Sequence, residues 1–207
     1  MATAVKICGI TRQADAAAAA RLGAHAVGFV FCAKSPRNVA AAAAAEIAAG
    51  LPPFITAAGL FVNAGAREVE DVLKQVSLNI LQFHGEETPA FCAGFGVPFI
   101  KAARVRAGLD LIQYAHDYRA ARGLLLDAFV DGTHGGTGTA FDWSLIPSEL
   151  PLPVILSGGL NTANVGEAIR RVAPWAVDVS SGVEASPGIK DPQKIAAFMK
   201  EVRSADV

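Results

Sequence analysis

Short apolar runs alternate with helix-forming segments along the chain, at intervals of about 25 residues. The runs are continuous, as in Leu124-Leu125-Leu126, which is typical of parallel strands buried on both faces. We expect strands at 5–8, 26–31, 55–62, 79–83, 99–103, 123–127, 154–160 and 176–182. We expect helices at 14–22, 39–50 and 66–76, one that opens at 86–89, and others at 109–118, 162–172 and 192–202, with a short segment around Trp143.

These elements form eight strand-then-helix units. Eight such units close into a (β/α)₈ barrel, so the sequence predicts an α/β fold with a single TIM barrel domain over residues 1–207. An open, doubly wound sheet is the alternative, but the number of units and the absence of a G-x-G-x-x-G motif after the first strand disfavour it. Thr11 or Asp15 is expected to cap the first helix, and Asp191 the last.

Composition argues against several classes of function. The net charge is −1, from 18 Lys and Arg against 19 Asp and Glu, and no basic cluster points to a nucleic-acid partner. No apolar run reaches the ~18 residues of a membrane span, and the first residues lead directly into a strand, so we expect neither membrane insertion nor a signal peptide. The three cysteines, Cys8, Cys32 and Cys92, lack C-x-x-C spacing, which favours a reducing cytoplasm over disulfides or structural zinc.

Polar residues gather where the expected strands end, and in a parallel barrel this is the end that carries the chemistry. They are Cys8, Arg37 in the loop after the second strand, Asn63, His84, Asp127, Ser157, Ser180 and Ser181. Asp127 is the strongest candidate, because a carboxylate closing a leucine run is costly without a partner or a purpose. Cys8 by itself would more often be a small buried hydrophobic residue. His84 fits a ligand contact and a hydrogen-bonded strand end equally well.

Three glycine-containing segments follow neighbouring strands of the closed barrel, at 135–138, 158–159 and 180–182. Glycine lets backbone N–H groups approach an anion closely, and a phosphate site near the seventh and eighth strands recurs in such barrels. We therefore expect a phosphate group there. Closure also makes the first and last strands neighbours, so Lys6 and Asp178 should meet inside the barrel. Lys6, nearby backbone N–H groups and a helix N-terminus are the candidates for lowering the pKa of the Cys8 thiol.

The motifs resemble those of one known family. They are V-K-I-C-G-I-T at 5–11, G-F-V-F at 28–31, S-P-R at 35–37, L-Q-F-H-G at 81–85, L-L-D at 125–127, G-G-T-G at 135–138, F-D-W at 141–143, S-G-G-L at 157–160 and D-V-S-S-G-V-E at 178–184. In this order and spacing they look like the phosphoribosylanthranilate isomerases of tryptophan biosynthesis. The chain departs from that pattern at Asn38, Phe83 and Ser157, which affects packing around an anthranilate ring.

The resemblance implies an Amadori rearrangement of N-(5-phosphoribosyl)anthranilate, a small phosphorylated aminosugar, with neither metal nor cofactor. By resemblance, Asp127 is the acid that protonates the furanose ring oxygen, and Cys8 is the base that removes the C2 proton. Arg37 would pair with the anthranilate carboxylate, and His84 would contact the substrate. The phosphate would lie on the backbone around Gly136, Gly138, Gly158, Gly159, Ser180 and Ser181.

Two other functions stay open at this point. One is a different phosphate-binding barrel enzyme, such as a pentose-phosphate epimerase, which would want an acid/base carboxylate pair and metal ligands. The other is a non-catalytic sensor of a sugar phosphate in which Cys8 is a redox-sensitive thiol. The sequence also leaves open whether the chain is a monomer or a homodimer, and whether it accepts the related aminoaldose of histidine biosynthesis.

Overall fold

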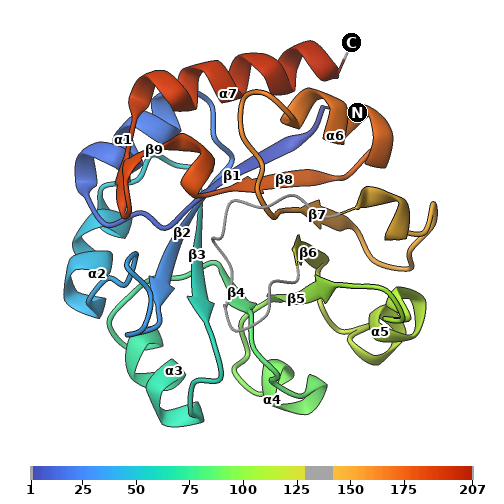
Figure 1. The fold of residues 1–207 in the computed structure, drawn as a ribbon. Coiled ribbons are helices and arrows are strands. Elements are labelled where there is room, and N and C mark those ends of the chain that lie inside the picture. Colours follow the sequence, from blue (N-terminus) through green and yellow to red (C-terminus); the bar gives the residue numbers. More distant parts are fainter. Residues whose placement is uncertain (1, 129–141, 207) are drawn as a thin grey trace.

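The computed structural model describes residues 2–128 and 142–206. In this part of the chain, eight parallel strands close into a barrel in the order β1 to β8, and helices cover its outside (Figure 1). The strands are β1 Ala4–Cys8, β2 Ala26–Phe31, β3 Thr56–Phe61, β4 Ile80–Phe83, β5 Phe99–Val105, β6 Leu124–Ala128, β7 Val154–Leu156 and β8 Ala176–Val179. The predicted TIM barrel is therefore confirmed.

The described helices follow the strands in the expected alternation. They are α1 Gln13–Arg21, α2 Ala41–Ala49, α3 Ala66–Leu73, α4 Pro89–Ala93, α5 Leu111–Asp117, α6 Val165–Val172 and α7 Pro192–Ala205. Two 3₁₀ turns, η1 Trp143–Leu145 and η2 Ser181–Val183, flank β7 and β8. A small antiparallel hairpin, β9 Glu184–Ser186 and β10 Ile189–Lys190, follows η2 and was not predicted.

The two predicted helix caps had different outcomes. Asp191 caps α7, because its carboxylate accepts hydrogen bonds from the N–H groups of Gln193 and Lys194. The prediction for α1 was wrong, since its N-cap position is Arg12 and no side chain caps it. The hydroxyl of Thr11 instead donates to the carbonyl of Gly188. A side chain with a tertiary partner is not available to its own helix end.

The inward face of the barrel changes from apolar to polar along β4, β5, β6 and β8, whereas Val30 on β2 and Leu60 on β3 keep it apolar beside Cys8. An apolar cluster lies near the N-terminal ends of the strands and consists of Ile100, Ala102, Leu125, Ile155 and Ala176. Successive strand residues face opposite ways, so the residues two positions further along point into the same interior. On β6 this alternation places Asp127 above Leu125, and on β1 it places Cys8 above Lys6. Asp127 and the other polar side chains at the mouth therefore lie above a layer of apolar side chains inside the barrel.

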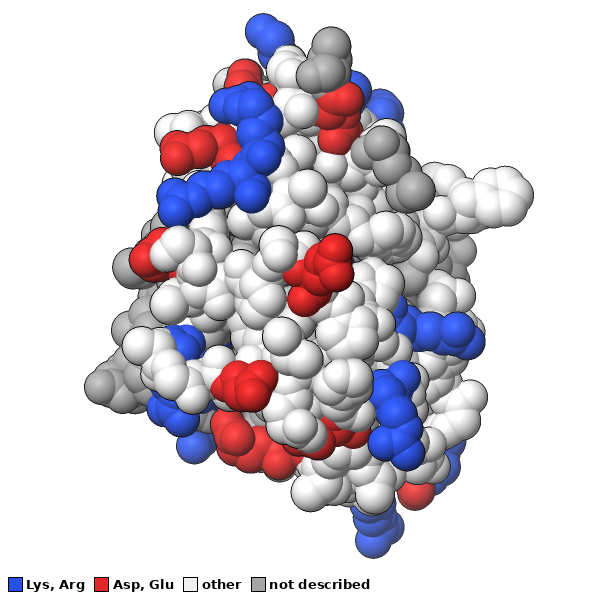
Figure 2. Space-filling model, turned by 90° about the vertical axis from the view of Figure 1, so that its right-hand side faces the viewer, with Lys and Arg blue, Asp and Glu red and all other residues white. Residues whose placement is uncertain are grey.

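None of the described helices is long and apolar enough to cross a membrane. On the side of the molecule drawn in Figure 2, acidic and basic side chains are scattered among uncharged ones and form no continuous basic band.

Candidate active site

Cys8 ends β1 and lies 5% exposed at the C-terminal mouth of the barrel. Lys6 shares its inward face, and the Lys6 Nζ donates a 2.8 Å hydrogen bond to Oδ1 of Asp178 on β8. Lys6 and Asp178 are in register because closure brings β1 beside β8. The predicted pair is confirmed, and it places a buried ammonium and a buried carboxylate one layer below the thiol.

Gly28 on β2 makes room for this arrangement. A Cβ atom there would lie 2.8 Å from the Cys8 Sγ and 3.2 Å from the Lys6 Nζ. Burial raises the pKa of the Cys8 thiol, while the neighbouring Lys6 lowers it and Asp178 raises it further. Lys6 acts in the expected direction, but the net direction is upward, so the expectation of a lowered thiol pKa was wrong. Desolvation of a thiolate in this closed corner outweighs the ammonium beside it.

Arg37 reaches the same side of the mouth from the loop after β2. Its Nε and Nη2 each donate a 2.8 Å hydrogen bond to the carboxylate of Glu184. The Nζ of Lys190 donates to the same carboxylate at 2.8 Å. The hydrogen bond to Glu184 raises the pKa of Arg37, so the guanidinium keeps its charge. Glycine at position 9 lets the side chain lie against the end of β1, because a Cβ there would come within 2.6 Å of the Arg37 Cδ.

Asp127 stands on another wall of the mouth, near the end of β6, and is 4% exposed. Its Oδ2 lies 3.0 Å from Nε2 of His84, which follows β4. Nδ1 of His84 lies 3.0 Å from Nε2 of Gln82, two residues earlier on the inward face of β4. The two nitrogens that His84 would need for a substrate contact are thus both engaged by protein side chains.

Strand β5 contributes a residue that the sequence did not single out. Arg104 is in register with Asp127 on the neighbouring strand and so faces the interior. The Arg104 Nη2 donates a 3.4 Å hydrogen bond to the backbone carbonyl of His84. A signal was available, because Arg104 is a polar residue next to an apolar run, but the predicted strand ended at 103.

The loops after β7 and β8 come together as expected. Gly158 and Gly159 have φ angles of 82° and 65°, a backbone conformation that favours glycine. A Cβ atom at Gly182 would collide with the carbonyl oxygen of Leu160, so glycine lets the two loops touch. Within the described residues, the N–H groups of Gly158, Gly159 and Ser181 donate to no protein acceptor. They are available to an anion.

Ser180, Gly136 and Gly138 are the remaining predicted phosphate ligands, and of these the structure describes Ser180. The carbonyl and hydroxyl oxygens of Ser180 both accept from the Nζ of Lys190, at 3.2 and 3.3 Å. Gly136 and Gly138 lie outside the described residues. Among the residues that are described, no group of three or more His, Cys, Asp or Glu side chains is placed to hold a metal ion.

Comparison with known proteins adds the family. Residues 5–201 match the family model described as N-(5'phosphoribosyl)anthranilate (PRA) isomerase. The chain is 58% identical over 202 residues to the N-(5'-phosphoribosyl)anthranilate isomerase of Nitrosospira multiformis, and the match covers 98% of this chain and 97% of that protein. The chain belongs to the PRA isomerase family. It is therefore an isomerase of tryptophan biosynthesis, as its motifs predicted.

Two solved structures of PRA isomerases share the fold over nearly the whole chain. One is a complex with reduced 1-(o-carboxyphenylamino)-1-deoxyribulose 5-phosphate, with a TM-score of 0.85, 42% identity and coverage of 98% of this chain and 99% of that one. The other is described as a mutually generated monomer of the dimeric enzyme from Thermotoga maritima, with a TM-score of 0.85, 40% identity and coverage of 97% and 98%.

The barrel brings together the predicted PRA isomerase residues that the structure describes. All lie at the C-terminal mouth or in its loops: Cys8, Arg37, His84, Asp127, Gly158, Gly159, Ser180 and Ser181. The sequence missed the groups that hold them, namely Gln82 beside His84 and the Glu184–Lys190 pair beside Arg37. Gln82 and Glu184 stand inside the motifs at 81–85 and 178–184, but a motif does not show which side chain each residue will contact.

Proposed function

We propose that the chain converts N-(5-phosphoribosyl)anthranilate to the 1-deoxyribulose 5-phosphate form with Asp127 as acid and Cys8 as base. Asp127 gives a proton to the furanose ring oxygen, the ring C–O bond breaks, and the anthranilate nitrogen forms a Schiff base with C1. Cys8 then takes the C2 proton, which leaves an enolamine that tautomerises to the ketone. The observation that carries this proposal is the placement of a thiol and a carboxyl, both inward, on the separate strands β1 and β6 at one mouth.

Two anion sites would hold the ends of the substrate. The unpaired N–H groups of Gly158, Gly159 and Ser181 suit the phosphate, since they converge where β7 and β8 end. Arg37 suits the anthranilate carboxylate: Glu184 occupies its Nε and Nη2, and among the described residues none accepts from its Nη1. A charged donor that is already oriented loses less entropy when it binds.

Turnover decides between this proposal and its rivals. The purified chain, treated with a chelator, should convert N-(5-phosphoribosyl)anthranilate, and inorganic phosphate should inhibit competitively. Replacing Gly159 with valine should raise KM, because the branched side chain disfavours the positive φ and blocks the approach of the phosphate. Chelator-sensitive epimerisation of a pentose phosphate, or phosphate binding with no turnover, would contradict it. The same assay with the histidine-pathway aminoaldose measures specificity.

We also propose that the chain forms a homodimer through the N-terminal end of the barrel, the end opposite the mouth. Phe54, just before β3, is 101% exposed and has a φ of 72°, a costly conformation for an aromatic residue. Trp175, just before β8, is 56% exposed at the same end. Exposed apolar surface that gathers at one end of a molecule often marks a protein–protein interface, whereas single exposed apolar residues are ordinary.

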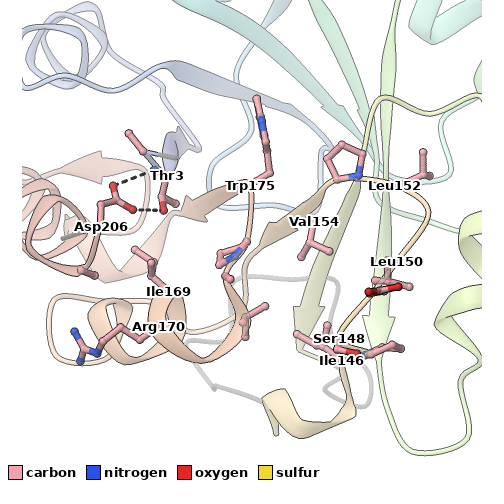
Figure 3. A pocket seen from close by; sticks show the side chains of 18 residues that line it. Thr3, Ile146, Ser148, Leu150, Leu152, Val154, Ile169, Arg170, Trp175 and Asp206 are labelled. Carbon is pink, nitrogen blue, oxygen red and sulfur yellow. Dashed lines mark hydrogen bonds between the residues drawn. The ribbon is translucent and has the colours of Figure 1, made fainter.

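A receiving surface lies at the same end. A groove of about 880 Å³ runs between the loop before β7, the loop before β8 and the chain termini. Leu150, Leu152, Val154 and Trp175 line it, and Thr3 and Asp206 close one side through hydrogen bonds between them (Figure 3). A second copy related by a twofold axis presents the same projecting ring and the same groove, which is how isologous interfaces satisfy both partners.

The dimer has a direct test. The mass in solution should be twice 21.4 kDa, and Phe54→Asn should give a single chain, because asparagine tolerates a positive φ but lacks the ring. Ile112→Ser is the matched control, since Ile112 is 46% exposed near the start of α5, at the mouth end. A wild-type mass of 21.4 kDa in sedimentation equilibrium would contradict the proposal.

A reducing compartment such as the cytoplasm fits the proposed chemistry. Cys8 has to remain a free thiol to act as a base, and Cys8, Cys32 and Cys92 are all free. An oxidising environment would put that thiol at risk.

A further inference from the structure

Gln82 has a fully buried side-chain amide. It was not among the predicted site residues, and the proposed chemistry assigns it no role. It is 0% exposed, and its Nε2 lies 3.0 Å from Nδ1 of His84. Its Oε1 finds no hydrogen-bond partner in the part of the chain that is described. A buried carbonyl oxygen without a partner costs on the order of 1–3 kcal/mol. An apolar residue would avoid that cost, so the amide needs another explanation.

The contact to His84 supplies it. A neutral imidazole has one N–H and one lone pair, and the bond made at one nitrogen decides which nitrogen carries the proton. Because the Gln82 Nε2 can only donate, it requires a lone pair on Nδ1 and places the His84 proton on Nε2. That N–H then points at Oδ2 of Asp127, 3.0 Å away.

We propose that Gln82 is a positioning residue for the acid step: it fixes the Nε2–H form of His84, and His84 in turn fixes the Asp127 carboxyl. An Nε2–H group makes Oδ2 an acceptor, so an acid proton on Asp127 has to sit on Oδ1. The opposite tautomer would present a lone pair to Oδ2 and draw the acid proton toward the imidazole, away from the substrate. Gln82 thus decides which carboxyl oxygen is the proton donor.

The proton balance of the step is simple. The proton on Oδ1 passes to the furanose ring oxygen as the ring C–O bond breaks, and the electron pair of that bond stays on oxygen. The carboxylate left behind keeps its hydrogen bond from the His84 Nε2–H, which stabilises the charge it has gained. Gln82 and His84 exchange no proton. Arg104, the cation on the adjacent strand, donates to the His84 backbone carbonyl and so contacts the same residue through its main chain.

Histidine tautomers can be read by nuclear magnetic resonance in protein labelled with ¹⁵N-histidine. The signals of His84 are assigned by their loss in His84→Gln. We expect Nε2 protonated and Nδ1 unprotonated in the wild-type protein, and a shift of the proton to Nδ1 in Gln82→Glu, whose carboxylate can only accept. Gln82→Met removes both options at similar volume, and we expect kcat to fall at least about tenfold with little change in KM.

The same variants separate positioning from packing. His84→Gln keeps an N–H near Oδ2 of Asp127 and should retain more turnover than His84→Leu. Thermal unfolding is recorded for each variant; if Gln82→Met does not fold, Gln82→Glu carries the test.

The inference is overturned if wild-type His84 is protonated on Nδ1, or if folded Gln82 variants keep wild-type kcat. It rests on Asp127 as the acid, and Asp127→Asn in the same assay tells the two failures apart. Full turnover in Asp127→Asn removes the acid assignment itself, whereas loss in Asp127→Asn with none in the Gln82 variants removes the positioning role alone.

Discussion

On the β1–β8 side of the barrel mouth, Cys8 lies next to the charged side chains of a buried ion pair. On the β4–β6 side, Asp127 is the last member of a chain of hydrogen bonds that starts at the side-chain amide of Gln82. A buried ion pair, Lys6 with Asp178, stands directly below the thiol. On the other wall, Gln82 and His84 lead to the carboxyl through two contacts of 3.0 Å. The proposed base and the proposed acid, at one end of the barrel, therefore have surroundings of different physical kinds.

The two surroundings indicate which neighbours control the pKa of Cys8 and which control the orientation of the Asp127 carboxyl. The reactivity of Cys8 follows the balance between burial and neighbouring charges, so removing a charge on that wall should move its pKa. Asp127 depends on which of its oxygens is engaged, so a change on that wall should alter kcat through orientation. Variants of the two walls should consequently fail in different ways.

The largest effect is expected where the proposed acid itself is removed. Asp127→Asn keeps the shape of the side chain but carries no transferable proton, so kcat should fall ~10²–10⁴-fold, while KM changes little. Steady-state kinetics on the natural substrate measure both. Asp117→Asn on α5 is the control, because Asp117 is exposed and, among the described residues, accepts only from Gln113 at the surface. A wild-type kcat in Asp127→Asn would show that Asp127 is not the acid.

The next largest effect concerns stability on the charged wall. Asp178→Ala leaves the Lys6 ammonium buried without its partner and should cost roughly 3–5 kcal/mol in the free energy of unfolding. Asp71→Ala breaks an ion pair of the same 2.8 Å length whose partners are 69% and 49% exposed, and it should cost no more than about 1 kcal/mol. Urea unfolding compares the two variants directly. Equal losses would mean that the burial of the Lys6 pair has no energetic consequence.

Arg37→Lys should have a smaller effect, on catalysis. Lysine keeps the charge but cannot bond Glu184 and a substrate carboxylate through one planar group. The fall in kcat/KM should correspond to a loss of about 1.5–3 kcal/mol in transition-state binding, the range of a charged hydrogen bond. The loss should appear mainly in KM, since Arg37 touches no reacting atom in the proposed step. Unchanged kinetics in Arg37→Ala would show that the substrate carboxylate binds elsewhere.

The smallest effect is a shift along the pH axis. Burial raises the pKa of Cys8, so the thiolate fraction is small near neutral pH and grows as the pH increases. The value of kcat/KM should therefore rise with pH, with a midpoint above the ordinary thiol pKa of about 8.5. Asp178 contributes to the upward shift, so Asp178→Asn should move the midpoint down, whereas Gln82→Met should leave it in place. A downward shift in both variants would erase the distinction between the walls.

The barrel and most of its mouth could be predicted because they follow from local patterns. Continuous apolar runs specify buried parallel strands, and a polar residue at the end of a run lies at the mouth whatever its partner is. The pairing of Lys6 with Asp178 was also predictable, because closure fixes which strands become neighbours.

What could not be predicted depends on distance and burial. The carboxylate that binds Arg37 belongs to Glu184, 147 residues further along the chain. The motif at 178–184 contains Glu184 but does not show that the chain brings it back to Arg37. The direction of the Cys8 pKa shift was misjudged because a sequence shows the nearby lysine but not the extent of desolvation. Gln82 reads as an ordinary polar residue until the fold places His84 and Asp127 beside it.

The most direct test of the division between a base wall and an acid wall is the kinetic isotope effect with substrate deuterated at C2. Loss of the Cys8 thiol slows only the cleavage of the C2–H bond, so Cys8→Ala should show a larger isotope effect than the wild-type protein, together with a kcat lower by ~10²–10⁴-fold. Asp127→Asn slows the earlier ring opening and should show an isotope effect no larger than that of the wild type. If Cys8→Ala keeps wild-type turnover and an unchanged isotope effect, Cys8 is a packing residue and the base lies elsewhere.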